Sequence, residues 1–284
     1  MLINLYGKEI ELRDNYCSLN NLKPLPIEKP YINLYVRMFS WCNAACPFCV
    51  YRDGYNTFNF NKFADILNYL KTKVEIRKVS FTGGEPTSSI NLLNNLIKKV
   101  RNITPFIVVN TNGFNIKELL INDVNSIALS RHHYDDDKNN AIFKTKMLSK
   151  KDIQNLNLKN LHLSCNIIKG QIDSRVEIEK YLEFATSIGV SDVGFVSLMK
   201  VNKYCEDNFL DFNTLLKSNT KNIKKYKQWE KEDVCRCTNY IYAKKGKYAL
   251  FYNRSVLKQK EGSTNTLLFT GEHLVHGFNN KIIY

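Results

Sequence analysis

Three cysteines stand close together in the segment WCNAACPFC. Cys42, Cys46 and Cys49 follow an apolar run at residues 32–38 with the spacing C-x3-C-x2-C. Three thiolates on one short loop can fill three corners of a metal site, whereas structural zinc sites usually take four ligands. A set of three leaves one position open, which an iron–sulfur cluster tolerates when a small molecule fills that position. The spacing therefore predicts an iron–sulfur site, with a zinc loop or three buried thiols as the plainer alternatives.

The other cysteines lie apart from this group, and three of them gather far downstream as Cys205, Cys235 and Cys237. Eight cysteines in 284 residues are too few for a disulfide scaffold. The N-terminal segment MLINLYGKEIELRD carries charges where a signal peptide would need an apolar run. Grouped cysteines without an export signal indicate metal or redox chemistry, so we expect a cytoplasmic protein. Cys17 cannot be assigned, and Cys165 reads as a small buried residue within a strand.

Glycine-rich and polar motifs follow two further strand-like segments. The motif GGEP at residues 83–86 comes after an expected strand, and two glycines let the backbone approach a ligand closely. Glu85 adds a carboxylate at the carboxyl end of that strand, where α/β proteins gather their sites. The motif NTNG at residues 110–113 ends the next strand, and an ordinary turn explains it as well as a binding role does.

Later strands also end in candidate binding residues. Ser130 and Arg131 close the strand expected at residues 126–130, Asn166 lies at the end of the following strand, and Leu198 closes the sixth. Two histidines come directly after Arg131, but neighbouring residues on an extended chain point to opposite sides. Joint metal binding by the two histidines is therefore the weaker interpretation.

Strand-like and helix-like segments alternate along the first two thirds of the chain. Residues 61–72 and 90–100 have helical spacing of apolar residues, and Ser174 is placed to cap a helix that runs to residue 188. Such alternation predicts βαβ units and a parallel sheet. After residue 200 the pattern changes, with one or two helices expected at 210–226 and a hairpin at 240–256. The six expected parallel strands lie at residues 32–38, 74–82, 106–109, 126–130, 161–168 and 193–198.

Composition bounds the class of protein. Hydrophobic residues make up 44% of the chain, which is enough for a sizeable core. No run approaches the roughly 18 apolar residues that a membrane span needs, so no membrane partner is expected. The net charge of +14 can indicate nucleic acid. Lysine is spread along the whole of a chain rich in Lys, Asn and Ile, which makes a nucleic-acid partner the less favoured interpretation.

The order of these motifs resembles the radical S-adenosylmethionine (radical SAM) superfamily. In that family a C-x3-C-x-aromatic-C loop holds a [4Fe–4S] cluster whose open iron binds SAM, and Phe48 stands at the position of the aromatic residue. The resemblance covers roughly residues 32–200. It implies an α/β fold, a partial (β/α)6 barrel of parallel strands, in which Cys42, Cys46 and Cys49 are the cluster ligands. The contacts with SAM that it implies are those of Phe48, Gly83, Gly84, Glu85, Ser130, Arg131, Asn166 and Leu198.

The second cysteine group is similar to the auxiliary-cluster cysteines of the molybdenum-cofactor cyclase family and of the SPASM/twitch enzymes. On this interpretation Cys205, Cys235 and Cys237 hold a second [4Fe–4S] cluster, and the hairpin after them is a small C-terminal twitch-like extension. Their spacing of C-x29-C-x-C departs from both families. Three unrelated thiols, or a zinc site, remain alternatives. The expected organisation is an N-terminal extension at 1–30, a core barrel at 31–200 and a C-terminal extension at 201–284.

The resemblance implies an enzyme that takes an electron from a donor such as flavodoxin or ferredoxin and reductively cleaves SAM. The resulting 5′-deoxyadenosyl radical would abstract hydrogen from a substrate. A peptide is the first expectation for that substrate, and a nucleotide or another small molecule is the second. A zinc-stabilised RNA-binding protein without catalysis stays open as a protein of a different class.

Overall fold

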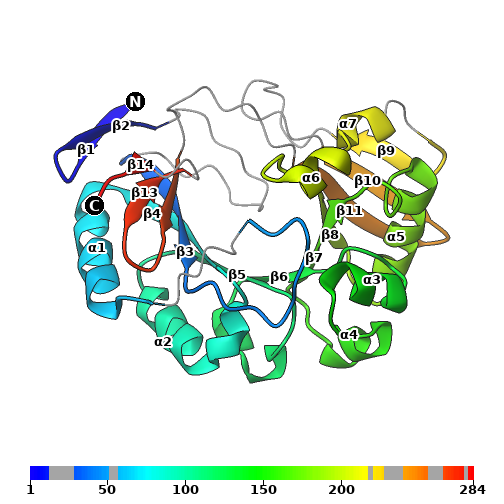
Figure 1. Ribbon diagram of the computed structural model, residues 1–284, viewed down its shortest axis with the longest axis horizontal. Coiled ribbons are helices and arrows are strands. Elements are labelled where there is room, and N and C mark those ends of the chain that lie inside the picture. Colours follow the sequence, from blue (N-terminus) through cyan, green and yellow to red (C-terminus); the bar gives the residue numbers. More distant parts are fainter. Residues whose placement is uncertain (13–28, 51–56, 217–219, 227–238, 255–264, 278–280) are drawn as a thin grey trace.

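A curved sheet with helices on its convex side forms the body of the protein (Figure 1). The computed structural model describes residues 1–12, 29–50, 57–216, 220–226, 239–254, 265–277 and 281–284. Within these residues the large sheet has the strand order β14-β13-β12-β3-β4-β5-β6-β7-β8-β11-β10-β9. The segment that follows β3 crosses the concave side of this sheet (Figure 1).

Six consecutive parallel strands, β3 to β8, make the centre of the sheet and confirm the expected partial (β/α)6 barrel. Each strand pairs with the next along the chain, so their carboxyl ends meet at one edge of the sheet. Their bounds are β3 Tyr31–Arg37, β4 Glu75–Thr82, β5 Phe106–Thr111, β6 Ser126–Ser130, β7 Leu161–Ile167 and β8 Asp192–Ser197.

Helices connect these strands and bury one apolar face each. In α1 (Phe60–Lys73) the side chain of Asn59 accepts the backbone N–H of Lys62, and this cap fixes the start of the helix. Helix α2 (Ile90–Val100) follows the short 3₁₀ turn η1 (Pro86–Ser89). Helix α5 (Arg175–Ser187) begins at Ser174, whose side chain accepts the N–H of Glu177 as predicted. Two 3₁₀ turns, η2 (Ile116–Glu118) and η3 (Ile121–Asp123), connect β5 to β6.

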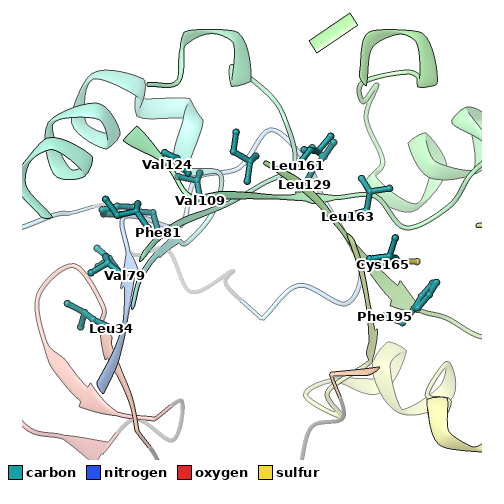
Figure 2. Close-up of a cluster of buried hydrophobic side chains, with 14 of the residues drawn as sticks. Leu34, Val79, Phe81, Val109, Val124, Leu129, Leu161, Leu163, Cys165 and Phe195 are labelled. Carbon is teal, nitrogen blue, oxygen red and sulfur yellow. The ribbon is translucent and has the colours of Figure 1, made fainter. Parts of the chain in front are cut away.

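The hydrophobic core lies between the convex side of the sheet and these helices. Figure 2 shows side chains from successive strands pointing toward the helices. Burying apolar surface in this layer is the main favourable term in folding and holds the strand ends in register. The labelled members are fully or almost fully buried: Leu34, Val79, Phe81, Val109, Val124, Leu129, Leu161, Leu163, Cys165 and Phe195. The burial of Cys165 confirms its interpretation as a small core residue.

The C-terminal part of the chain adds strands to both edges of the six. Strand β11 (Lys247–Arg254) pairs parallel with β8, and β12 (Thr266–Phe269) pairs parallel with β3. Antiparallel strands complete each side, so the expected division near residue 200 does not separate two sheets. They are β9 Ile223–Tyr226, β10 Asn239–Lys244, β13 Leu274–His276 and β14 Lys281–Ile282.

Local differences from the expected elements have local causes. An additional helix follows Tyr134: Asp135 caps α3 (Asp136–Phe143), and further acidic residues lie in its first turn. Helix α4 (Lys150–Leu156) follows with a capping box, and α6 (Lys203–Asp207) follows β8. Of the one or two helices expected at 210–226, the described residues of that stretch form the short α7 (Phe212–Leu215), and β9 stands where further helix was expected. At the N-terminus, β1 (Leu2–Leu5) and β2 (Lys8–Glu11) form a separate hairpin.

The hairpin expected at 240–256 is confirmed as β10 and β11, which turn at Lys245-Gly246. Both turn residues have positive φ, as a two-residue hairpin loop requires. Among the described residues, no helix is long and apolar enough to cross a membrane.

Candidate functional site

The three cysteines of the C-x3-C-x2-C motif lie on the loop after β3, and all three are partly buried. The backbone N–H of Cys49 donates to the carbonyl oxygen of Cys46 at 3.2 Å, which forms a tight turn between two of the thiols. The N–H of Ala45 donates to the carbonyl oxygen of Phe143, at the end of α3, at 2.9 Å. The loop is therefore tied to the core by its backbone.

The GGEP motif is paired directly with the start of this loop. The N–H of Glu85 donates to the carbonyl oxygen of Trp41 at 2.7 Å. A Cβ added at Gly84 would lie 1.8 Å from that same oxygen, and Gly83 has a φ of +135°. Only glycine fits such a close approach and such a backbone conformation. The two glycines thus let the ends of β3 and β4 come together directly before Cys42.

The carboxylate of Glu85 organises two loops. Its Oε1 accepts the N–H of Thr87 at 3.0 Å, the hydroxyl of Thr87 at 2.7 Å and the hydroxyl of Thr111 at 2.5 Å. Its Oε2 accepts the N–H of Asn112 at 2.7 Å. Burial raises the pKa of Glu85, and these four hydrogen bonds oppose the rise. Glu85 is 1% exposed, so only Oε2, which accepts a single bond, keeps acceptor capacity for a ligand.

Asn112 carries this network to the first cysteine. Its Nδ2 donates to the Sγ of Cys42 at 3.6 Å and to the Oδ1 of Asn43 at 2.7 Å. The N–H of Ala44 also points to the Cys42 sulfur, at 3.4 Å. Burial raises the pKa of Cys42, the nearby Glu85 and Cys49 add to the rise, and the two N–H donors oppose it. Cys42, Cys49 and the GGEP carboxylate therefore share one electrostatic neighbourhood.

The guanidinium of Arg131 binds groups outside this neighbourhood. Its Nε donates to the carbonyl oxygen of His133, its Nη1 to that of Leu148 and its Nη2 to that of Tyr134. Nη2 also pairs with the carboxylate of Asp136, and the residue is 1% exposed. The guanidinium thus fastens the segment between β6 and α4, and this geometry favours a structural role over a contact with a cofactor. Ser130, which precedes it, is partly buried at the end of β6.

His132 links the strand end at Asn166 to the cysteine loop. Its Nδ1 accepts the N–H of Asn166 at 3.1 Å. Its ring stacks on Phe143 with centroids 4.8 Å apart and meets the ring of Phe48 edge-on at 5.0 Å. Burial, together with the nearby charge of Arg131, lowers the pKa of His132 to about 3. His132 is therefore a neutral packing residue behind Phe48.

A second apolar cluster, separate from the main core, gathers around Phe48 and Leu198. Leu198 is 4% exposed, and Phe48 packs against this cluster as a partly buried residue. The resemblance implies contacts with SAM for both residues, and they belong to the same apolar cluster. The buried members are Ile142, Ile168, Leu198 and Cys205.

The second cysteine group is described only in part. Cys205 is 1% exposed, lies in α6 and directs its Sγ toward the carbonyl oxygen of Phe48 at 3.9 Å. Cys235, Cys237 and Cys17 lie outside the described residues. Within the described part of the chain, no set of three or more His, Cys, Asp or Glu side chains is close enough to hold a metal ion. Cys42, Cys46 and Cys49 are among these described residues, so their cluster as well as the auxiliary cluster stays a prediction.

Comparison with known proteins gives the class to which this arrangement belongs. The family model of the radical SAM superfamily matches residues 36–191, more than half of the chain. The chain therefore belongs to the radical SAM superfamily, a family of enzymes that implies a [4Fe–4S] cluster and SAM. This match confirms the resemblance and the enzyme class that the motifs predict.

Individual relatives are distant and longer. A probable GTP 3′,8-cyclase of Thermococcus kodakarensis is 32% identical over 98 residues, which cover 32% of this chain and 30% of that protein. Streptococcus suis SuiB bound to S-adenosylmethionine matches with a TM-score of 0.52 at 19% identity, over 62% of this chain and 43% of SuiB. SuiB bound to the precursor peptide SuiA gives 0.51 at 19% identity, over 62% and 41%. The chain spans less than half of these proteins, and the SuiB likeness shows the fold.

Three residues of the site were not among the candidates predicted from sequence, although two of them lie in a motif. Thr87 and Thr111 position the Glu85 carboxylate, and Asn112 donates to a cysteine sulfur. Thr111 and Asn112 belong to the NTNG motif, which an ordinary turn explained equally well. The signal was present, since a strand end with two amides and a hydroxyl offers more donors than a turn uses.

Proposed function

We propose that Cys42, Cys46 and Cys49 hold the [4Fe–4S] cluster of this enzyme and that SAM binds between their loop and the carboxyl ends of β4 to β8. One observation carries the proposal: the chain of contacts from Glu85 through Asn112 to the sulfur of Cys42. It ties three separate motifs, C-x3-C-x2-C, GGEP and NTNG, to one point at the end of the barrel.

The residue types on this loop suit such a cluster, while in the described structure the three sulfurs are not gathered closely enough to hold a metal ion. Three thiols on one loop leave an iron position open for a small molecule. Two N–H donors, from Ala44 and Asn112, point to the Cys42 sulfur, and such donors stabilise a thiolate over a thiol. When bound, the cluster and SAM supply a 5′-deoxyadenosyl radical through one-electron reductive cleavage of the sulfonium.

The chain's own residues bind, orient and exclude water. Glu85 holds the N–H of Asn112 in place and keeps one acceptor position on Oε2 for the amino group of SAM. Phe48 and Leu198 offer an apolar surface for the adenine, backed by the neutral ring of His132. An apolar lining keeps water away from a reactive radical. Gly83 and Gly84 allow the backbone approach that forms the end of the site.

A peptide is the substrate that we place first. SuiB, whose fold this chain shares over 62% of its length, was crystallised with a precursor peptide. A nucleotide is the second candidate, because the curated relative is a probable GTP 3′,8-cyclase. An auxiliary cluster held by Cys205, Cys235 and Cys237 belongs to the proposal for either substrate, and a flavodoxin or ferredoxin would supply the electron.

The proposal is tested by anaerobic reconstitution of the full chain with iron and sulfide. We expect about four irons per chain for one cluster, or about eight for two, and formation of 5′-deoxyadenosine from SAM under reductant. The Cys46→Ala variant should lose one cluster and all of the SAM cleavage. Cys165→Ala, which removes a thiol buried in the core, is the matched control. It should keep the wild-type iron content and the SAM cleavage. A colourless protein that binds zinc and RNA with steep salt dependence would instead identify the non-catalytic alternative.

A further inference from the structure

The cysteine loop has a second support, and it comes from the segment that leaves the barrel. Asn202, the residue directly before the short helix α6, donates from Nδ2 to the carbonyl oxygen of Pro47 at 3.1 Å. Its Oδ1 accepts the N–H of Cys205 at 2.9 Å. One side-chain amide therefore caps α6 and binds the backbone of the cysteine loop between Cys46 and Cys49.

Two residues of α6 also contact the cysteine loop or the apolar cluster beside it. The sulfur of Cys205 lies 3.9 Å from the carbonyl oxygen of Phe48, and Tyr204 packs on the same apolar cluster as Phe48. Two successive carbonyl groups of the loop thus face α6. On the other side, Phe143 accepts the N–H of Ala45. The turn that carries two of the three thiols is held between α3 and α6.

We propose that Asn202 is a positioning residue, which holds the turn between Cys46 and Cys49 through the carbonyl of Pro47 and so orients these two residues for cluster binding. The inference rests on the proposed function, because it gives the tie a purpose in cluster binding. It goes beyond that function because it assigns a role to the C-terminal segment, 155 residues away from Pro47 in the sequence. Loss of an outer contact that orients metal ligands typically weakens metal binding about 10- to 100-fold.

Two substitutions separate this role from helix capping alone. Ser and Asp are both good N-cap residues, so Asn202→Ser and Asn202→Asp keep an acceptor for the N–H of Cys205. Neither offers the Nδ2 donor. In Asn202→Asp, the negative carboxylate also repels the partly negative carbonyl oxygen of Pro47. Asn160→Ser is the matched control, since Nδ2 of Asn160 also donates to a backbone carbonyl, that of Val124, at 2.7 Å.

The first measurement uses the apo chain and does not depend on a cluster. Hydrogen–deuterium exchange is followed at the amides of Ala45 and Cys49, which are both hydrogen-bonded within the loop region. We expect roughly 10-fold faster exchange there in Asn202→Ser and Asn202→Asp, with no change in Asn160→Ser and similar unfolding midpoints in all three. Unchanged exchange at these two amides would overturn the inference, and so would faster exchange throughout the chain, which indicates a general loss of stability.

The second measurement uses the reconstituted chain and an iron chelator. Both Asn202 variants should release iron about 10 to 100 times faster than the wild type, whereas Asn160→Ser should match it. Release at the wild-type rate from Asn202→Ser would also refute the positioning role. If the wild type takes up no iron, the proposed function fails on that result alone, while the exchange experiment still decides whether Asn202 holds the loop.

Discussion

Replacing Glu85 by Gln tests whether the buried carboxylate organises the site. The carboxylate accepts four hydrogen bonds, three on Oε1 and one on Oε2. Gln has the same shape, and with its oxygen at the Oε1 position it keeps the contacts with Thr87 and Thr111. Its NH₂ group then faces the N–H of Asn112, so one hydrogen bond is replaced by two opposed donors.

The magnitude follows from these contacts. A hydrogen bond to a charged group contributes about 1.5–3 kcal/mol, and a buried donor left unsatisfied costs about 1–3 kcal/mol. Removing the charge relieves the cost of its burial, which offsets part of that loss. We expect Glu85→Gln to lower the free energy of unfolding by about 2–3 kcal/mol, which corresponds to a decrease in Tm of roughly 4–12 °C for a domain of this size.

Urea denaturation and thermal unfolding of the apo chain measure this effect. Glu118→Gln is the matched control, because the side chain of Glu118 is exposed in the 3₁₀ turn η2 and should change stability by less than about 0.5 kcal/mol. Asn112 should also exchange its amide proton faster in Glu85→Gln. If Glu85→Gln is as stable as Glu118→Gln, the carboxylate does not hold the two loops together.

Three further predictions concern the residues around the cysteine loop. Gly84→Ala places a Cβ 1.8 Å from the carbonyl oxygen of Trp41, a backbone atom, and should lower the unfolding free energy by about 3 kcal/mol in urea denaturation; a neutral effect would contradict the close approach. His132 stays neutral in the folded chain with its pKa lowered to about 3, while the unfolded chain binds a proton below about pH 6.5. Stability is therefore lost as the pH falls below 6.5, by about 3 kcal/mol at pH 4.5, and denaturation of apo His132→Gln should show a flatter pH dependence. Cys205→Ala should lose about four irons, as the proposed auxiliary cluster requires; wild-type iron content would instead identify Cys205 as a packing residue of the apolar cluster beside Phe48.

The strands and the main motifs could be predicted from sequence because their signals are local. Apolar runs such as FIVV at residues 106–109 mark a strand buried on both faces, and glycine pairs mark a close approach. Roles that depend on distant partners could not be read in this way. Arg131 stands at a strand end like a binding residue, yet its acceptors include the carbonyl of Leu148, 17 residues further on. Asn202 likewise gives no sign that its partner is Pro47. Helix α4 is absent from the expected elements although Ser149 begins a capping box, because seven residues are too few to show a clear helical period of apolar residues.

The parallel pairing of β11 with β8 and of β12 with β3 has a consequence for the integrity of the molecule. Both open sides of the six-strand arc are closed by residues from the last 40 positions of the chain. A protein truncated at the end of β8 would present two rows of unsatisfied N–H and C=O groups at once, and exposed edges of that kind recruit other chains. The last part of the sequence therefore protects the barrel from self-association, whatever it contributes to catalysis.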